Sequence, residues 1–401
     1  MNIGLFTETY YPEINGVATS VYMLKQELEK RGHNVYVFTT KTPGAPNHEL
    51  NVFRVPSKPF VFISERRVGL FYQPKLAAII RKLNLDIIHT HTEFSLGIFG
   101  RIMARELKLP IVHTYHTIYE DYTHYLTRFK ALDKKAKAFA RVYSKVCCNT
   151  VEQVIVPTEK TKQLLLKYSV HKEISVVPTG IDLYKFDARN YTKEKVLALK
   201  KQYKITKDNK VLLYLGRVSL EKNLEEIITA MPEYMKTREE VKFVIVGSGP
   251  ALDKLQLLVK QLGIRERVIF TGSQPWDIIG LYYRLGDVFV SASQSETQGL
   301  TYIEALACGL PVVAREDKCL DNILINGQNG YTFTDKKGFY YGLDQVLFKD
   351  TKTDYSRNAI QMAKTFSSEV FAGRVEDVYK QVISRDRVYC KRPTVITKRI
   401  D

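Results

Sequence analysis

Two series of short hydrophobic runs, separated by helical patterns, organise the chain. The first series predicts these strands and helices: Ile3–Phe6, Val35–Thr39, Asp86–His89 and Ile111–Thr114, and about Thr19–Arg31 and Leu96–Leu107. The second predicts these: Val211–Leu215, Val241–Val246, Val268–Phe270, Val288–Ser291 and Val312–Ala314, and Leu224–Met231 and Tyr302–Cys308. Alternation of this kind is typical of parallel sheets with helical crossovers. It predicts an α/β protein with two doubly wound, Rossmann-like domains.

The stretch between the two series is polar, rich in lysine and weakly periodic, which is typical of a linker. We therefore expect an N-terminal domain at 1–180, a linker at 181–208 and a C-terminal domain at 209–367. Residues 368–401 are expected to form a helix that returns to the first domain, followed by a basic tail. Doubly wound sheets bind ligands at the carboxyl ends of their strands, so two facing domains would enclose a cleft.

The charge of the chain is unbalanced. The 401 residues hold 60 Lys and Arg against 43 Asp and Glu, a net charge of +17, and residues 1–200 carry +12 of it. Such an excess indicates an anionic partner, either nucleic acid, a phosphorylated substrate or a membrane surface. No run reaches the roughly 18 apolar residues of a membrane span, and the first residues lack the features of a signal peptide. We expect a cytosolic protein whose membrane contact is peripheral.

The most informative motif runs from Glu296 to Glu304, after a predicted strand. Two glutamates eight positions apart share one face of a continuous helix, where one would meet a sugar and the other a ribose. Gly299 and a helix N-terminus would let an anion approach. A helix start with two solvated glutamates explains the same residues, and the motif alone leaves both readings open.

Arg217 and Lys222 follow another predicted strand and suit a diphosphate, with a solvated charged loop as the alternative. Asn15-Gly16 and Gly247–Pro250 are further turns at strand ends. The second of these turns lacks the third glycine of a dinucleotide fingerprint. No Asp-x-Asp pair is present to hold a metal on a diphosphate. We expect Arg217, Lys222 and backbone amides to neutralise the diphosphate without a metal.

Four of the eight histidines gather at two neighbouring strand ends: His89, His91, His113 and His116. Such a group could bind zinc, contact a polar substrate or make structural hydrogen bonds. No carboxylate stands out as a further ligand, and the five cysteines have no C-x-x-C spacing. We therefore expect no metal here.

Apolar residues recur at steps of three and four between residues 126 and 146, which predicts one helical stripe. Its members are Leu126, Phe129, Leu132, Ala136, Phe139, Tyr143 and Val146. Seven basic residues lie among them, opposed only by Asp133: Arg128, Lys130, Lys134, Lys135, Lys137, Arg141 and Lys145. An apolar face beside a basic one is typical of a helix in an anionic membrane interface. A core-facing helix with a solvated basic face is the alternative.

In chain order, these motifs resemble the family-four retaining glycosyltransferases, which have the GT-B fold. The resemblance covers nearly the whole chain and rests on Gly16, His116-Thr117, Arg217 with Lys222, the 247–250 turn, and Glu296 with Glu304. The segments His89–Gly97 and His116–Tyr122 are most similar to the bacterial diacylglycerol glucosyltransferases, which make monoglucosyldiacylglycerol from UDP-glucose. Thr297-Gln298 replaces the usual aromatic residue after the first glutamate, which alters the expected sugar contacts.

The resemblance implies a UDP-sugar donor, a diacylglycerol acceptor and an enzyme bound peripherally to the cytoplasmic membrane face. It implies that Arg217 and Lys222 stabilise the departing diphosphate, whose β-phosphate takes the acceptor proton and so retains configuration. Glu296 would bind sugar hydroxyls, Glu304 the ribose, and His116 the sugar near its reacting carbon. The remaining implied donor contacts are Gly16, Gly249, Thr297, Gln298, Gly299 and Leu300.

Three other functions fit parts of the sequence. The acceptor could be another lipid-linked molecule or a polysaccharide, or the same fold could epimerise a nucleotide sugar. Nucleic-acid binding is disfavoured, because recognition motifs are absent and one predicted helix explains much of the basic excess.

Overall fold

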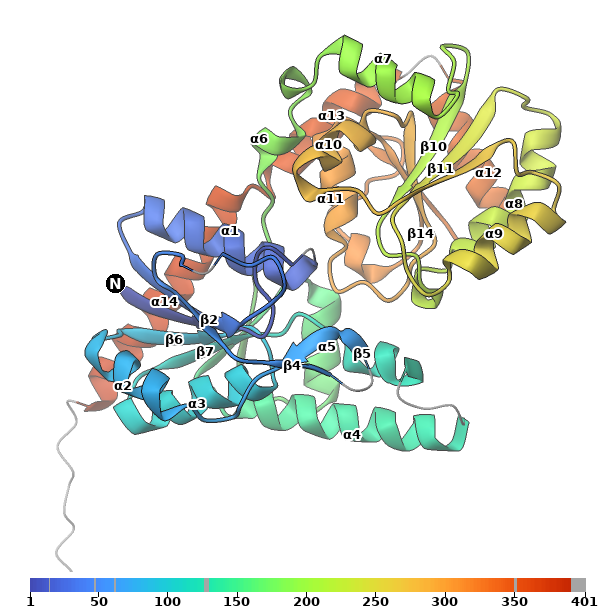
Figure 1. Cartoon of the computed structure of the whole chain (residues 1–401). Coiled ribbons are helices and arrows are strands. Elements are labelled where there is room, and N and C mark those ends of the chain that lie inside the picture. The colour runs from blue at the N-terminus through green and yellow to red at the C-terminus, as the bar shows by residue number, and fades with distance from the viewer. Residues whose placement is uncertain (14, 47, 61–62, 126–129, 350–351, 391–401) are drawn as a thin grey trace, which may run out of the picture. The chain divides into compact units, whose positions relative to one another are not determined.

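The computed structural model describes all residues except 14, 47, 61–62, 126–129, 350–351 and 391–401. The chain forms two compact units (Figure 1). Unit 1 comprises Met1–Pro178 and Phe371–Asp401, and unit 2 comprises Thr179–Val370.

Unit 1 is built on a seven-stranded parallel sheet with the order β3-β2-β1-β6-β7-β8-β9. Its strands are β1 (Asn2–Phe6), β2 (Asn34–Thr40), β3 (Val52–Val55), β6 (Ile87–Thr90), β7 (Ile111–Thr114), β8 (Gln153–Val156) and β9 (Glu173–Val176). An antiparallel pair, β4 (Lys58–Phe60) and β5 (Ile63–Val68), follows β3. The chain order reverses between β1 and β6, which makes this the topological switch point of the sheet.

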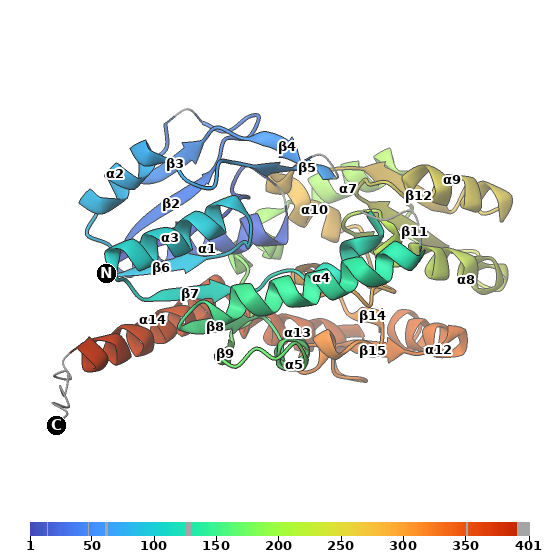
Figure 2. The ribbon, with the colours of Figure 1, turned by 90° about the horizontal axis from the view of Figure 1, so that it is seen from below.

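Helices cover both faces of this sheet. One face packs against α2 (Pro74–Lys82), α3 (Ser95–Leu107), α4 (Lys130–Asn149) and α5 (Glu159–Lys167). The other packs against α1 (Gly16–Lys30) and the C-terminal α14 (Ser368–Cys390). A 3-10 helix, η1 (Tyr119–Tyr125), contacts α4, which Figure 2 shows as the long green helix. Phe371, Val375 and Tyr379 of α14 lie in the core of unit 1, so α14 covers part of this face of the first sheet.

Unit 2 is built on a six-stranded parallel sheet with the order β12-β11-β10-β13-β14-β15. Its strands are β10 (Lys210–Leu215), β11 (Val241–Val246), β12 (Val268–Gly272), β13 (Val288–Ser291), β14 (Val312–Arg315) and β15 (Gly330–Phe333). The chain order reverses between β10 and β13, so the switch point lies there.

Two groups of helices cover this second sheet. One group is α6 (Leu183–Phe186), α7 (Lys193–Gln202), α10 (Ile279–Tyr283), α11 (Leu300–Ala307) and α13 (Lys352–Lys364). The other is α8 (Leu224–Lys236), α9 (Leu252–Gln261) and α12 (Lys336–Leu347). The connections include the 3-10 helices η2 (Ala188–Asn190), η3 (Leu220–Lys222), η4 (Trp276–Ile278) and η5 (Lys318–Leu320).

The stretch expected to be a linker belongs to unit 2. It contains α6, η2 and α7, and it contributes Ile181, Phe186, Leu199 and Ile205 to the core. Helices α6 and α7 each bury one residue, and η2 buries none, so the sequence shows little periodicity. The compact units therefore divide after Pro178, and residues 181–208 are not a free connection.

Most predicted elements are present, with shifted ends. The strands β7, β11 and β13 have the predicted bounds. Helix α8 continues past its predicted end at Met231 and through Pro232. Tyr234 and Met235 are buried beyond that proline, so packing outweighs the cost of the missing amide hydrogen bond.

Candidate functional site

Lys222 and Glu296 form an ion pair beyond the strands that flank the unit 2 switch point. Lys222 Nζ lies 2.5 Å from Glu296 Oε1, and the side chains are only 16% and 17% exposed. Lys222 ends η3 after β10, and Glu296 follows β13, which pairs directly with β10. Ligands of doubly wound sheets bind at this position. The fold thus brings together two predicted site residues that are 74 positions apart.

Glu296 and Glu304 do not share a helix, contrary to the prediction from their spacing. Helix α11 begins at Leu300, after Gly299, so Glu296 lies in the preceding loop. Glu304 lies on α11, where its Oε2 accepts a hydrogen bond of 2.6 Å from the Tyr283 hydroxyl. Burial raises the pKa of Glu304 to about 7, although Tyr283 and Lys185 favour its charged form. The two carboxylates therefore occupy different environments.

Gln298 makes structural hydrogen bonds, whereas the resemblance implies that it contacts the UDP-sugar. Its Oε1 accepts from the Thr179 amide at 2.8 Å, and its Nε2 donates to the Thr179 carbonyl at 2.9 Å. The side chain is buried, so both of its polar groups serve the backbone at the start of unit 2. The neighbouring Thr297 is half-buried, and Leu300 is the first residue of α11.

Two glycines permit the close approach of the loops that carry the charged residues. A Cβ at Gly249 would lie 2.3 Å from the Val218 carbonyl oxygen, one residue after Arg217. Gly299 has a φ of 77°, and a Cβ there would lie 2.4 Å from the Tyr302 ring. A side chain at either position would displace these loops.

The first loop of unit 1 holds the remaining predicted glycine. Gly16 is exposed and is the first residue of α1. Asn15 caps this helix, because its Oδ1 accepts from the Ala18 amide at 3.0 Å. Gly16 therefore lies at the N-terminus of α1. The loop before it follows β1, one of the two strands that flank the unit 1 switch point.

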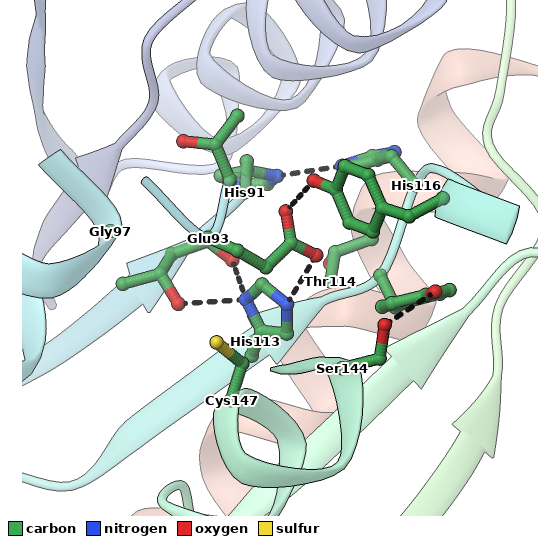
Figure 3. A network of polar contacts seen from close by, with 12 residues as sticks. His91, Glu93, Gly97, His113, Thr114, His116, Ser144 and Cys147 are labelled. Carbon is green, nitrogen blue, oxygen red and sulfur yellow. Dashed lines mark hydrogen bonds and ion pairs between the residues drawn. The ribbon is translucent and has the colours of Figure 1, made fainter. Parts of the chain in front are cut away.

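The four histidines lie at the carboxyl ends of β6 and β7, and each is hydrogen-bonded. Figure 3 shows three of them, His91, His113 and His116. We call the four rings and their hydrogen-bond partners the histidine network. His89 bonds to the Tyr379 hydroxyl through Nδ1 at 2.6 Å and to Thr114 Oγ1 through Nε2 at 2.7 Å. The His91 ring lies 3.9 Å from the His89 ring, and His91 Nδ1 lies 3.1 Å from His116 Nε2. Burial lowers the pKa of His89 and His91 well below the usual value, and that of His116 to about 3. These three rings are neutral at physiological pH.

Glu93 belongs to this network, although the sequence pattern did not identify it as a candidate carboxylate. It is 2% exposed, accepts a hydrogen bond from the Tyr119 hydroxyl, and lies 3.2 Å from His113 Nε2. Its position two residues after His91 was the available signal. Within the described residues, no group of three or more His, Cys, Asp or Glu side chains is arranged to hold a metal ion. The contacts seen are hydrogen bonds.

Three large apolar residues of α4 whose side chains are described do not lie on a buried face, as they would in a core-facing helix. Phe139, Val142 and Val146 are 70%, 60% and 54% exposed. The buried face instead carries small or weakly polar residues: Ala140, Ser144, Cys147 and Cys148. Ala136 and Tyr143, from the predicted stripe, are half-buried. Leu126 and Phe129 lie outside the described residues, as does the side chain of Leu132.

The basic residues of α4 differ in their partners. Lys134 and Lys135 are exposed, and Lys145 is half-buried. Lys137 pairs with Asp133 at 2.9 Å, and Arg141 makes two bonds to Glu120 at 2.5 and 3.0 Å. Arg128 and the side chain of Lys130 lie outside the described residues. Among the described helices, none is long and apolar enough to cross a membrane.

Comparison with known proteins agrees with this architecture. The model described as Glycosyltransferase Family 4 matches residues 14–185, and that described as Glycosyl transferases group 1 matches 196–364. The chain is 39% identical to the alpha-monoglucosyldiacylglycerol synthase of Streptococcus pneumoniae, over 96% of this chain and 86% of that protein. It is 36% identical to the protein of that name from Acholeplasma laidlawii, over 96% and 98%.

Solved structures show the same fold. Sucrose-phosphate synthase from Thermosynechococcus elongatus has a TM-score of 0.76 at 22% identity, over 96% of this chain and 99% of that one. Anabaena HepE in complex with UDP-glucose has a TM-score of 0.75 at 17% identity, over 95% and 100%. The expected GT-B fold, with two parallel-sheet Rossmann-like domains, is confirmed. The chain belongs to the family-four glycosyltransferases.

Proposed function

We propose that this protein is a retaining glucosyltransferase that moves glucose from UDP-glucose to diacylglycerol at a membrane surface. The observation that carries the donor side of the proposal is the Lys222–Glu296 pair beside the unit 2 switch point. It occurs in a chain 39% and 36% identical to two proteins named alpha-monoglucosyldiacylglycerol synthase. The UDP-glucose complex of the structurally similar Anabaena protein supports the same class of donor.

On the donor side, Lys222 and Arg217 supply positive charge to the diphosphate of UDP-glucose. The carboxylate of Glu296, held by Lys222, accepts hydrogen bonds from sugar hydroxyls. Further hydrogen bonds to the UDP-sugar come from the backbone amides of Gly16, Gly249, Thr297, Gly299 and Leu300. Gly299 and Leu300 lie at the start of α11. Such groups lower the barrier by stabilising charge on the departing phosphate, so we propose that no divalent metal is required.

Glu304 is the proposed ribose contact. Its pKa of about 7 leaves its carboxyl close to half protonated at neutral pH. Two ribose hydroxyls would donate to the carboxylate and favour its charged form. The Tyr283 hydroxyl already donates to Oε2 and holds the group in place.

On the acceptor side, we propose that the acceptor oxygen approaches the sugar C1 from the same face that the phosphate leaves. The bond from the sugar C1 to the phosphate oxygen breaks, and a bond from C1 to the acceptor oxygen forms. The acceptor hydroxyl proton passes to an oxygen of the departing β-phosphate, so configuration at C1 is retained. His116, neutral because of burial, contacts the sugar without supplying charge.

Helix α4 is the proposed membrane contact, on the cytoplasmic face. Phe139, Val142 and Val146 present exposed apolar surface, and Lys134 and Lys135 are exposed on the same helix. This combination fits the interface of an anionic leaflet, where each basic residue contributes about 1 kcal/mol. Phe139 stacks on Tyr143, whose hydroxyl donates to the Glu93 carbonyl at 2.6 Å. The exposed apolar surface is thereby connected to the histidine network.

The test is a transfer assay with vesicles that contain diacylglycerol and an anionic phospholipid. Each UDP-sugar of a panel is added in the presence of a strong chelator, and the lipid product is identified by mass spectrometry and by its anomeric proton signal. We expect an α-glucosyl lipid from UDP-glucose. Epimerisation of the nucleotide sugar without a lipid, or a strict need for Mg²⁺, would contradict the proposal.

A further inference from the structure

The starting observation is an unusual histidine. His91 is 1% exposed, and its Nε2 is buried with no hydrogen-bond partner among the residues that the structure describes. Its other nitrogen, Nδ1, lies 3.1 Å from His116 Nε2. Figure 3 shows the two rings joined by this bond at the edge of the network. One nitrogen of His91 therefore serves only His116.

The hydrogen bond between the two rings contains one proton, which is carried either by His91 Nδ1 or by His116 Nε2. If His91 Nδ1 accepted, the His91 proton would sit on Nε2, where it has no acceptor. If His91 Nδ1 donates, Nε2 is a lone pair without a donor. Buried N–H groups without acceptors are the rarer defect, so the second arrangement is favoured. His116 then accepts at Nε2 and, as a neutral ring, carries its own proton on Nδ1.

We propose that His91 is a positioning residue that fixes both the ring orientation and the tautomer of His116. It places the N–H donor of His116 on Nδ1, on the side of the ring away from His91. The link to turnover rests on the proposed function, in which His116 contacts the sugar. The assignment of the proton does not depend on that function.

The surroundings of His91 restrict its ring. The His89 ring lies 3.9 Å away, and His89 is itself bonded on both sides, to Tyr379 and to Thr114. Tyr379 comes from α14, 290 positions away in the chain, and Thr114 precedes His116 by two residues. A ring held on such a support can direct its Nδ1–H at one position, which a flexible surface histidine cannot do.

The direct test is the protonation pattern of the imidazole nitrogens, measured by long-range ¹H–¹⁵N correlation on the full chain with labelled histidine. His116→Gln identifies the His116 signals. In the wild type we expect His116 to be protonated at Nδ1. In His91→Phe, which keeps a ring against His89, His116 should shift toward the Nε2 form. His91→Asn, which restores a donor close to the Nδ1 position, should return it to Nδ1.

The second measurement is turnover by the same variants. We expect kcat of His91→Phe to fall about 10- to 100-fold with little change in the KM for UDP-glucose, as for a small misplacement of a contact group. His91→Asn should recover most of it. His171→Phe, at an exposed histidine, is the matched control.

Three results would overturn parts of this assignment separately. Wild-type His116 protonated at Nε2 would refute the proton assignment. A tautomer shift in His91→Phe with normal kcat would refute its role in turnover. If the wild type transferred no glucose, the proposed function would fail, while the spectra would still decide the role of His91.

Discussion

The carboxyl ends of the two sheets carry polar groups of opposite character. Beyond β10 and β13, at its switch point, unit 2 holds a charged pair, Lys222 and Glu296, on loops shaped by glycines. At the ends of β6 and β7, unit 1 holds neutral histidine rings in the histidine network. Two sheets of similar topology thus support different sites. In one, Lys222 and Glu296 compensate each other's charge, and in the other, hydrogen bonds hold the orientation of neutral histidine rings.

The difference follows from burial. Lys222 and Glu296 keep part of their surface in water and have each other as partners, which limits the cost of desolvation. The rings of His89 and His91 are almost fully buried, and burial disfavours the charged imidazolium form. Four variants test this contrast, in order of decreasing effect.

Removing the charge of Lys222 should have the largest effect. Lys222→Ala leaves the diphosphate and Glu296 without their cation, and we expect kcat to fall about 10²- to 10³-fold. Steady-state assays with UDP-glucose and diacylglycerol vesicles measure this. Lys236→Ala, at an exposed lysine of α8, is the control. A well-folded Lys222→Ala protein with near-normal turnover would place the charge-compensating site elsewhere.

Neutralising basic residues of α4 should weaken membrane binding. For the combined variant Lys134→Gln, Lys135→Gln and Lys145→Gln, we expect affinity for anionic vesicles to fall about 100-fold, from about 1 kcal/mol per residue. Vesicle co-sedimentation measures it. The control neutralises three exposed lysines of or beside α7: Lys193, Lys195 and Lys201. Equal losses in both variants would mean that net charge, not α4, binds the membrane.

The raised pKa of Glu304 predicts a loss of stability with increasing pH. Its folded-state pKa of about 7 lies above the ordinary 4.5, so the folded state holds the proton more tightly than the unfolded state. This stabilisation is complete below pH 4.5 and disappears as pH rises through 7, a change of about 3 kcal/mol. Urea unfolding across this range should show the slope, and Glu304→Gln should lose it. An unchanged slope in Glu304→Gln would assign it to other groups.

Tyr379→Phe should have the smallest effect. It removes the hydroxyl that bonds to His89 Nδ1 at 2.6 Å but keeps the packed ring. We expect the free energy of unfolding to fall by about 1 kcal/mol, or somewhat more because a buried nitrogen is left without a partner. Tyr184→Phe, at a largely exposed tyrosine, should be neutral in the same urea titration. Equal stability of the two variants would mean that α14 does not brace the network.

Much of the architecture could be predicted from local pattern. The hydrophobic runs predict β7, β11 and β13 with their observed bounds, and the motifs identify both members of the Lys222–Glu296 pair. The prediction failed where packing decides. Helix α8 passes Pro232, Glu296 lies outside α11, and residues 181–208 fold into unit 2.

The chemistry of the charged site is local, because short loops after strands carry the residues and the strand order brings those loops together. The histidine network is different. Tyr379 reaches His89 across 290 positions. His91 meets His116, and Glu93 meets His113, only when β6 and β7 lie side by side. No spacing along the chain encodes which nitrogen of a buried ring finds a partner. The sequence by itself therefore determines the residue types and predicts the strand ends. Burial and the pairing of distant groups, which set the charge of a side chain and the position of its proton, are decided only by the tertiary structure.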